Sequence, residues 1–131
     1  TGRQFSVRDF VNRAAAEVGL TLTWQGEGVD EIGIVEAVDV SQLQQASGSR
    51  QGLECHVKPG DTIVRVDPRY FRPTEVETLL GNPAKAKEKL GWEPRTSFED
   101  MVAEMAREDL ALSMRDAVCK VAGFKTFSHN E

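Results

Sequence analysis

Hydrophobic residues recur at helical spacing near the start of this chain. Ser6 and Asp9 stand three residues apart where the run begins, which is the spacing of a capping box. Gly19 follows the run and is a typical helix stop. One face of the predicted helix carries the apolar positions Val7, Phe10, Val11, Ala14, Ala15 and Val18. The pattern therefore predicts an amphipathic helix between Ser6 and Gly19.

Three stretches further on have the alternating or β-branched character of strands. They are Leu20 to Trp24, Ile32 to Val40 and Asp61 to Val66. The segment 41–60 is polar, dotted with glycine and without a clear period, which predicts a loop insertion at the surface. Helices and short strands together predict an α/β fold.

The second half of the chain is dominated by helix signals. Pro73 to Leu80 has the pattern of a short helix. Asn82 and Pro83 then predict a second helix, with Asn82 as its N-cap, that stops at Gly91.

A long amphipathic helix is expected after these two. Ser97 and Asp100 have the spacing of another capping box, and the helix is expected to extend toward Cys119. Phe98, Met101, Val102 and Met105 share one face, which we assign to core packing. Residues 124–131 are expected to form a tail.

Size and charge narrow the class of protein. The 131 residues suffice for a single domain, which we place at 1–131. Acidic residues outnumber basic ones by 21 to 16, so nucleic acid is a poor candidate for a partner. No apolar run approaches the roughly 20 residues that a membrane-spanning helix needs. Cys55 and Cys119 lack metal or redox spacing, which is typical of reduced thiols in a cytoplasmic protein.

The stretch VDPRYFRPTE, Val66 to Glu75, has the composition of a binding loop. Its two prolines restrict the backbone, so little conformational entropy is lost when a ligand binds. Arg72 precedes a predicted helix start, and its planar guanidinium suits a phosphate. Glu75 could accept hydrogen bonds from two neighbouring hydroxyls, as on a ribose.

A simpler interpretation competes with this one. Arg72 and Glu75 are also spaced to form a surface ion pair, and Glu75 could serve only the helix dipole. Composition and spacing alone favour this structural interpretation.

The longer stretch VDPRYFRPTEVETLLGNPAKAKEKLGWEP resembles the C-terminal substrate-binding region of the GDP-mannose 4,6-dehydratase family, within the extended short-chain dehydrogenase/reductases. TGRQFSVRDFVNRAA before it and FEDMVAEMAREDL after it fit the same pattern in the same order. The resemblance is weakest over 41–57 and in the tail. It implies a small substrate-binding lobe without the Rossmann core.

The resemblance also implies roles for two residues. In the family, the arginine and glutamate of the R-P-x-E run contact the GDP part of GDP-mannose, and they match Arg72 and Glu75. Arg69 and Tyr70 share the loop and are expected to support them. No catalytic residue and no metal ligand is expected in this chain.

Other motifs of the family are missing. The chain has no glycine-rich NADP loop, and its single tyrosine, Tyr70, is not part of a Tyr-x-x-x-Lys pair. We therefore expect this chain to be the C-terminal part of a longer, homo-oligomeric enzyme. A missing Rossmann domain would bind NADP and convert GDP-mannose to GDP-4-keto-6-deoxymannose.

Two alternatives stay open at this level. The chain could be a free-standing nucleotide-sugar-binding or interaction module without catalysis, or part of a related epimerase or dehydratase that acts on another nucleotide.

Overall fold

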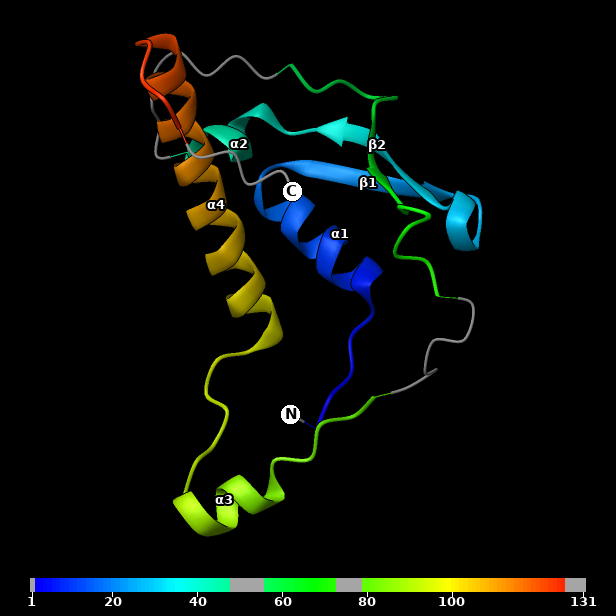
Figure 1. The fold of residues 1–131 in the computed structure, drawn as a ribbon, viewed down its shortest axis with the longest axis vertical. Helices are drawn as coiled ribbons and strands as arrows, with labels where there is room; N and C mark the ends of the chain where they lie inside the picture. Colours follow the sequence, from blue (N-terminus) through cyan, green and yellow to red (C-terminus); the bar gives the residue numbers. More distant parts are fainter. Residues whose placement is uncertain (1, 48–55, 73–78, 127–131) are drawn as a thin grey trace.

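The computed structural model describes residues 2–47, 56–72 and 79–126 of the chain. Within them, a three-stranded antiparallel sheet, helix α1 (Val7–Glu17) and helix α4 (Phe98–Val121) form three successive layers (Figure 1). α1 is the middle layer, because it contacts strand β1 on one side and α4 on the other. The α/β fold predicted from the sequence is confirmed.

α1 begins and ends where the pattern predicts. The Ser6 hydroxyl accepts a hydrogen bond from the Asp9 amide at 3.0 Å, and the Asp9 carboxylate accepts one from the Ser6 amide at 2.8 Å. Gly19 has φ 79°, and a Cβ there would lie 2.4 Å from the Asp39 carbonyl oxygen. Both the turn and the close approach therefore require glycine. Val7, predicted to lie on the apolar face, is exposed.

The sheet is a simple antiparallel meander. β1 (Leu20–Gln25) pairs with β2 (Ile32–Val38), which pairs in turn with β3 (Thr62–Arg65). Gly33 of the central strand lies opposite Trp24 on one side and Val64 on the other. A Cβ on Gly33 would lie 3.0 Å from Cβ of Val64 and 3.3 Å from Cζ3 of Trp24, so the missing side chain lets its neighbours meet across the strand.

The prediction of a loop insertion over 41–60 is wrong in its first part. Residues Val40–Ala46 form helix α2, and β2 ends at Val38 rather than Val40. The cause is Asp39, whose carboxylate accepts hydrogen bonds from the Ser41 and Gln42 amides at 2.9 and 3.1 Å. This cap starts a short helix in a segment whose polar composition predicted a loop. Residues 48–55 lie outside the described part of the chain.

α4 is fixed to α1 by packing and by one ion pair. Phe98 stacks on Phe5 with ring centroids 3.8 Å apart, and Val102 and Ala103 are buried. One helix turn further on, Arg107 pairs with the buried carboxylate of Glu17, with Nε 2.7 Å from Oε1. The predicted capping box at Ser97 is half formed. The Ser97 hydroxyl accepts from the Asp100 amide and donates to the Asp100 carboxylate, with no return bond to the Ser97 amide.

Residues 79–97 form an arm that projects from the three layers (Figure 1). It contains helix α3 (Ala84–Leu90), which stops at Gly91 as predicted and begins one residue after the expected position. The Asn82 side chain accepts a hydrogen bond from the Ala84 amide. Gly2 donates to the Gly81 carbonyl oxygen and ties the arm to the N-terminal segment. Leu79 and Leu80 are not helical, contrary to the prediction for 73–80, whose first six residues lie outside the described part.

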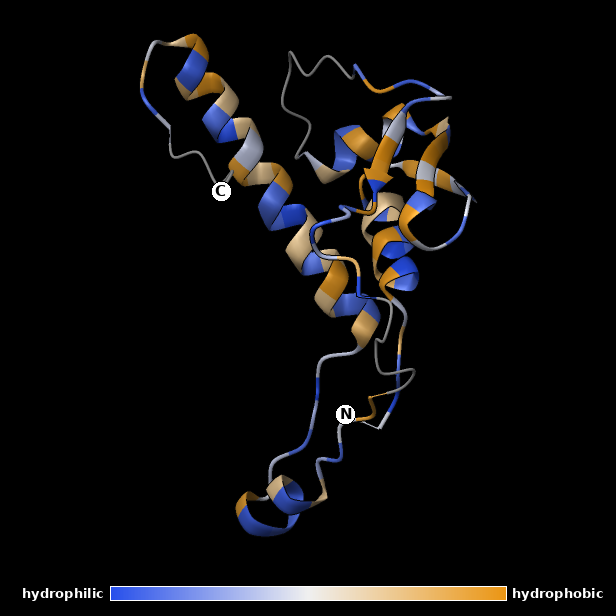
Figure 2. Ribbon diagram, turned by 45° about the vertical axis from the view of Figure 1, so that its right-hand side comes forward, coloured by the Kyte–Doolittle hydropathy of each residue, from blue (hydrophilic) through white to orange (hydrophobic). Residues whose placement is uncertain are grey.

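Hydrophobicity follows the layers only in part. Figure 2 shows hydrophobic positions concentrated in the strands and α1, whereas α3 is largely hydrophilic. Met101 and Met105, assigned to the core from the sequence, are 42% and 46% exposed. Of the predicted α4 stripe, only Val102 is fully buried. No helix of the described ranges combines the length and apolar character needed to cross a membrane.

The packing of α4 on α1 generates a stability prediction. Val102→Ala removes two methyl groups from a site with 0% exposure and should lower the free energy of unfolding by roughly 2 kcal/mol. Val118→Ala makes the same change on the same helix at a position that is 70% exposed and should change it by less than about 0.5 kcal/mol. Urea denaturation of the two variants measures the difference, and equal effects would contradict this packing.

Candidate functional site

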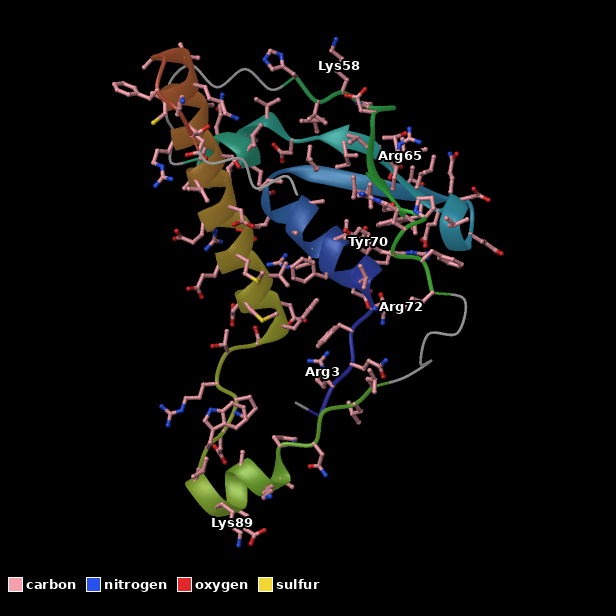
Figure 3. The ribbon with its side chains drawn as sticks, viewed as in Figure 1. Arg3, Lys58, Arg65, Tyr70, Arg72 and Lys89 are labelled. Atoms are coloured by element: carbon pink, nitrogen blue, oxygen red, sulfur yellow. The ribbon has the colours of Figure 1, made fainter. Side chains whose placement is uncertain are left out.

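The candidate site is the loop Val66–Arg72, which follows the edge strand β3. Arg65, Tyr70 and Arg72 succeed one another along this segment as it leaves the sheet (Figure 3). The loop contains a turn in which the Tyr70 amide donates to the Asp67 carbonyl oxygen at 3.0 Å. Pro68 occupies the second position of that turn, where its fixed φ is favourable.

An ion pair between Asp67 and Arg69 stabilises this turn. The Arg69 guanidinium donates to both carboxylate oxygens of Asp67, from Nε at 3.2 and 3.0 Å and from the terminal nitrogen at 2.7 Å. The Arg69 amide donates to the same carboxylate at 2.9 Å. Such a two-pronged contact fixes orientation as well as distance. The backbone of the turn and the Arg69 side chain are therefore held by one carboxylate.

A second contact attaches the loop to the turn after β1. The Phe71 ring packs over Gly28, where a Cβ would lie 3.8 Å from the ring atoms Cε2 and Cζ. Gly28 begins the short 3-10 helix η1 (Gly28–Asp30), which connects β1 to β2. The loop is thus fixed at both ends, by β3 on one side and by this aromatic contact on the other.

Arg72 comes directly after these contacts and differs from Arg69. Its side chain is exposed, and no hydrogen bond or ion pair joins it to any other residue of the described ranges. Glu75 lies outside the described residues, so the structure does not test the predicted pairing of Arg72 with Glu75. Of the two loop arginines, Arg69 is paired within the loop, whereas Arg72 has no partner among the described residues.

The ion pair also sets the protonation of the loop. Hydrogen bonds from the Arg69 side chain and then its backbone lower the pKa of Asp67 below its ordinary value of 3.8. The same contact raises the pKa of Arg69. A lowered pKa in the folded state means that the contact stabilises the loop above the ordinary pKa and is lost as the pH falls through the lowered one.

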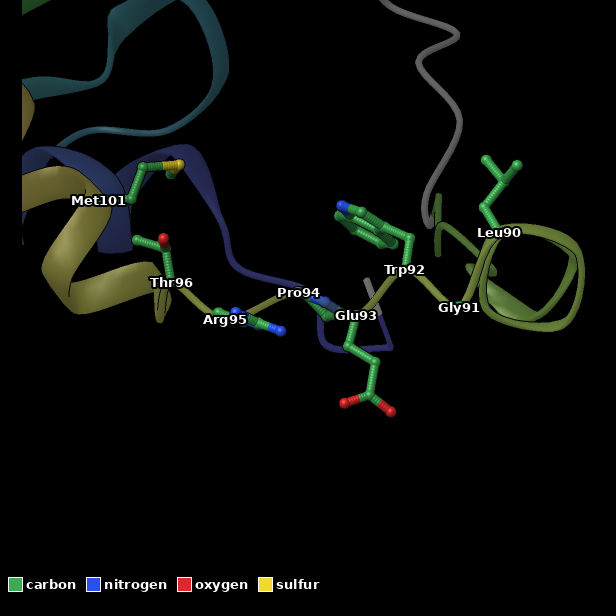
Figure 4. Close-up of a pocket in the computed structure, with 8 residues that line it drawn as sticks. All are labelled: Leu90, Gly91, Trp92, Glu93, Pro94, Arg95, Thr96 and Met101. Carbon is green, nitrogen blue, oxygen red and sulfur yellow. The ribbon is translucent and has the colours of Figure 1, made fainter.

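Two open cavities lie elsewhere in the described part of the chain. One, of about 720 Å³, lies between the arm and the start of α4, and Trp92 and Met101 rise on the same side of the segment that joins them (Figure 4). The other, of about 450 Å³, is a polar cleft between α1, α2 and α4 in which Glu17 already pairs with Arg107. Neither includes a residue of the loop.

The remaining chemical candidates from the sequence carry no site. His56 is exposed, whereas Cys55 and His129 lie outside the described residues. Within the ranges that the structure describes, no three His, Cys, Asp or Glu side chains are grouped as metal ligands. The Asp67–Arg69 pair was not anticipated, although Asp-Pro at the start of a turn is a recognisable signal for it.

Comparison with known proteins identifies the family. A family model described as GDP-mannose 4,6 dehydratase matches residues 1–105. The chain is 49% identical over 123 residues to a GDP-mannose 4,6-dehydratase of Vibrio cholerae, covering 94% of this chain and 30% of that protein.

The chain belongs to the GDP-mannose 4,6-dehydratase family. A GDP-mannose 4,6-dehydratase of Yersinia enterocolitica is 48% identical over 95% of this chain, and GDP-mannose 4,6 dehydratase 2 of Caenorhabditis elegans is 48% identical over 88%. The chain spans 25% to 30% of the length of these relatives. The resemblance seen in the sequence is confirmed.

The Asp67–Arg69 ion pair of this loop generates a prediction about the pKa of Asp67. An NMR titration of the Asp67 carboxyl group should give a pKa below 3.8, because Arg69 stabilises the charged form. Arg69→Gln should return that pKa toward 3.8, whereas Arg65→Gln, which changes an arginine without a contact to Asp67, should leave it low. A pKa that does not respond to Arg69→Gln would show that the pair is not formed in solution.

Proposed function

We propose that this chain forms the part of a GDP-mannose 4,6-dehydratase that binds the GDP end of GDP-mannose. The observation that carries the proposal is the exposed Arg72 guanidinium, unpaired within the described ranges, at the end of a loop that an internal ion pair holds in place. A planar guanidinium can donate two parallel hydrogen bonds to a diphosphate. Membership of the family supplies the substrate class, since the relatives are named for GDP-mannose.

Glu75 has the second role in this proposal. The resemblance assigns Glu75 to the GDP part of the substrate, and its carboxylate can accept hydrogen bonds from two neighbouring hydroxyls, as on a ribose. Glu75 stands three positions after Arg72, so the two side chains could hold adjacent parts of one nucleotide. Keeping the carboxylate on the sugar and the guanidinium on the phosphates avoids repulsion between Glu75 and the diphosphate.

The whole enzyme would convert GDP-mannose to GDP-4-keto-6-deoxymannose with bound NADP. The residues described here do not fit an NADP site, since their three strands are antiparallel and β1 leads through Gly26 and Gly28 into a single 3-10 turn rather than an α-helix. We therefore assign NADP to a separate Rossmann domain of the enzyme and no catalytic step to this chain, which alone should be inactive.

Holding the GDP end would contribute to turnover as well as to affinity. The diphosphate and nucleoside do not react, so their binding energy can be used to fix the mannose ring against the catalytic groups. A loop that is ordered before binding loses little entropy when the substrate arrives. The Asp67–Arg69 pair would supply that order.

The proposal is tested by Arg72→Ala in the full-length enzyme. Loss of a charge-assisted contact of roughly 1.5–3 kcal/mol should raise KM for GDP-mannose by roughly ten- to a hundredfold. Steady-state kinetics with GDP-mannose as the varied substrate measures the change.

Arg115→Ala is the matched control, because it removes an exposed arginine from α4 that pairs, among the described residues, only with the adjacent Asp116. Its KM should equal that of the unaltered enzyme. Unchanged KM and kcat in Arg72→Ala would refute the assignment of Arg72 to the diphosphate.

We further propose that the arm contacts other parts of a homo-oligomeric enzyme. Leu90 is 80% exposed, and it lines the larger cavity together with Trp92 and Met101. Apolar groups gathered in this way on a monomer are typical of an interaction surface. The relatives are more than three times as long as the matched region, so they contain ample chain to cover it.

Exposure of the arm predicts that the isolated chain self-associates. Leu90→Glu should reduce the association measured by sedimentation velocity, because it places a charge among the apolar groups of the arm. Ala111→Glu, at an exposed position on α4, is the control and should leave association unchanged. A chain that stays monomeric at every concentration would argue against this surface.

A further inference from the structure

Tyr70 is the most exposed aromatic side chain of the candidate loop, with 75% of its surface accessible. Burying an aromatic ring releases more free energy than burying most side chains. A ring exposed to water can therefore contribute to binding when a ligand covers it. Phe71, its neighbour, already uses part of its surface on Gly28. Tyr70 has no such contact with another ring within the described ranges.

One face of the Tyr70 ring is nevertheless occupied. The Arg69 guanidinium carbon lies 5.5 Å from the ring centroid, which is the range of a cation–π contact. Arg69 is itself held by both carboxylate oxygens of Asp67. The carboxylate, the guanidinium and the ring therefore form a short stack inside the loop. We call the ring face away from Arg69 the open face, because no other ring or cation of the described residues contacts Tyr70, which is 75% exposed.

We propose that the open face of Tyr70 stacks on the nucleobase of the substrate, with Arg69 supporting the opposite face. This inference rests on the proposed function, because it places the base of the nucleotide whose diphosphate contacts Arg72. Tyr70 and Arg72 are two residues apart, so their Cα atoms are separated by at most about 7 Å. In a nucleoside diphosphate, one ribose separates the base from the phosphates, and the reach of the two side chains can span that distance.

The stack also gives each charged residue of the loop a distinct role. Arg69 is a positioning residue, since it is neutralised by Asp67 and would act on the base only through Tyr70. Arg72 would contact the ligand directly. A flat π-surface binds any base by stacking and contributes roughly 1–3 kcal/mol, so Tyr70 supplies affinity for the base without choosing among bases.

The experiment compares GDP with inorganic pyrophosphate as inhibitors of the full-length enzyme, because pyrophosphate has the phosphates without the base. Tyr70→Ala should weaken inhibition by GDP by roughly five- to a hundredfold and leave inhibition by pyrophosphate unchanged. Tyr70→Phe keeps the ring and should match the unaltered enzyme for both ligands. Arg72→Ala should weaken both ligands.

Phe124→Ala is the matched control, because it removes another exposed aromatic ring, 70% accessible, far along the chain from the loop. It should change inhibition by neither ligand. The midpoint of thermal unfolding, measured for every variant, should change little, because the Arg69–Tyr70 contact that Tyr70→Ala removes is exposed to solvent.

Each contrary result has a separate meaning. The stacking proposal is overturned if Tyr70→Ala is inhibited by GDP as strongly as the unaltered enzyme, or if inhibition by GDP and by pyrophosphate weakens equally. The role of Arg72 still stands in that case if Arg72→Ala weakens inhibition by both ligands. If Arg72→Ala weakens neither ligand while Tyr70→Ala weakens GDP alone, the stack is supported and the proposed diphosphate contact fails.

Discussion

The position of α1 between two layers is the constraint on which the rest of the structure depends. An eleven-residue helix with one apolar stripe has to pack against both the sheet and α4, and each side is secured by a different polar contact. Toward the sheet, Arg8 lies over the Trp24 ring and pairs with Glu31, and the Trp24 indole donates to Asn12. Toward α4, Glu17 accepts Arg107.

That arrangement determines where the candidate loop can lie. Because β3 is the last strand in a sheet whose first strand packs on α1, the chain leaves the fold at the free edge of the sheet. The loop therefore begins on a rigid element and continues into solvent. Rigidity past that point is local, and it comes from one carboxylate that binds the backbone and side chain of Arg69. A site built in this way is ordered without being buried.

Local signals in the sequence predicted much of this fold. The Ser6 capping box, the stops at Gly19 and Gly91 and the three strands each follow from a few neighbouring residues. Errors occurred where a short cap or a neighbouring element was decisive. The segment 41–60 shows no clear period over its length, yet Asp39 caps a helix in its first part, and Met101 is 42% exposed although it shares the predicted face with Val102. Whether a stripe is covered depends on the neighbouring element, which periodicity does not reveal.

The candidate site shows the same division. Proline and turn residues predicted a stiff loop, but not which of its two arginines would be free. That distinction arises because Asp67, at the start of the turn, pairs with Arg69 and not with Arg72. Spacing treats the two arginines as equivalent, whereas the geometry of the turn neutralises one of them.

The charge of the chain makes this distinction important. With a formal net charge of −5, the chain does not attract an anionic nucleotide from a distance. At physiological ionic strength, however, a charge is largely screened beyond about 8 Å, so affinity depends on the groups in direct contact. Under the proposed function, the Arg72 guanidinium, unpaired within the described ranges, would contact the diphosphate, whereas Arg69, already paired with Asp67, would act through the aromatic ring. Recognition of this kind would combine a single charged contact with an uncharged surface for the base, and the turn at Asp67 places Arg69, Tyr70 and Arg72 close together in one loop.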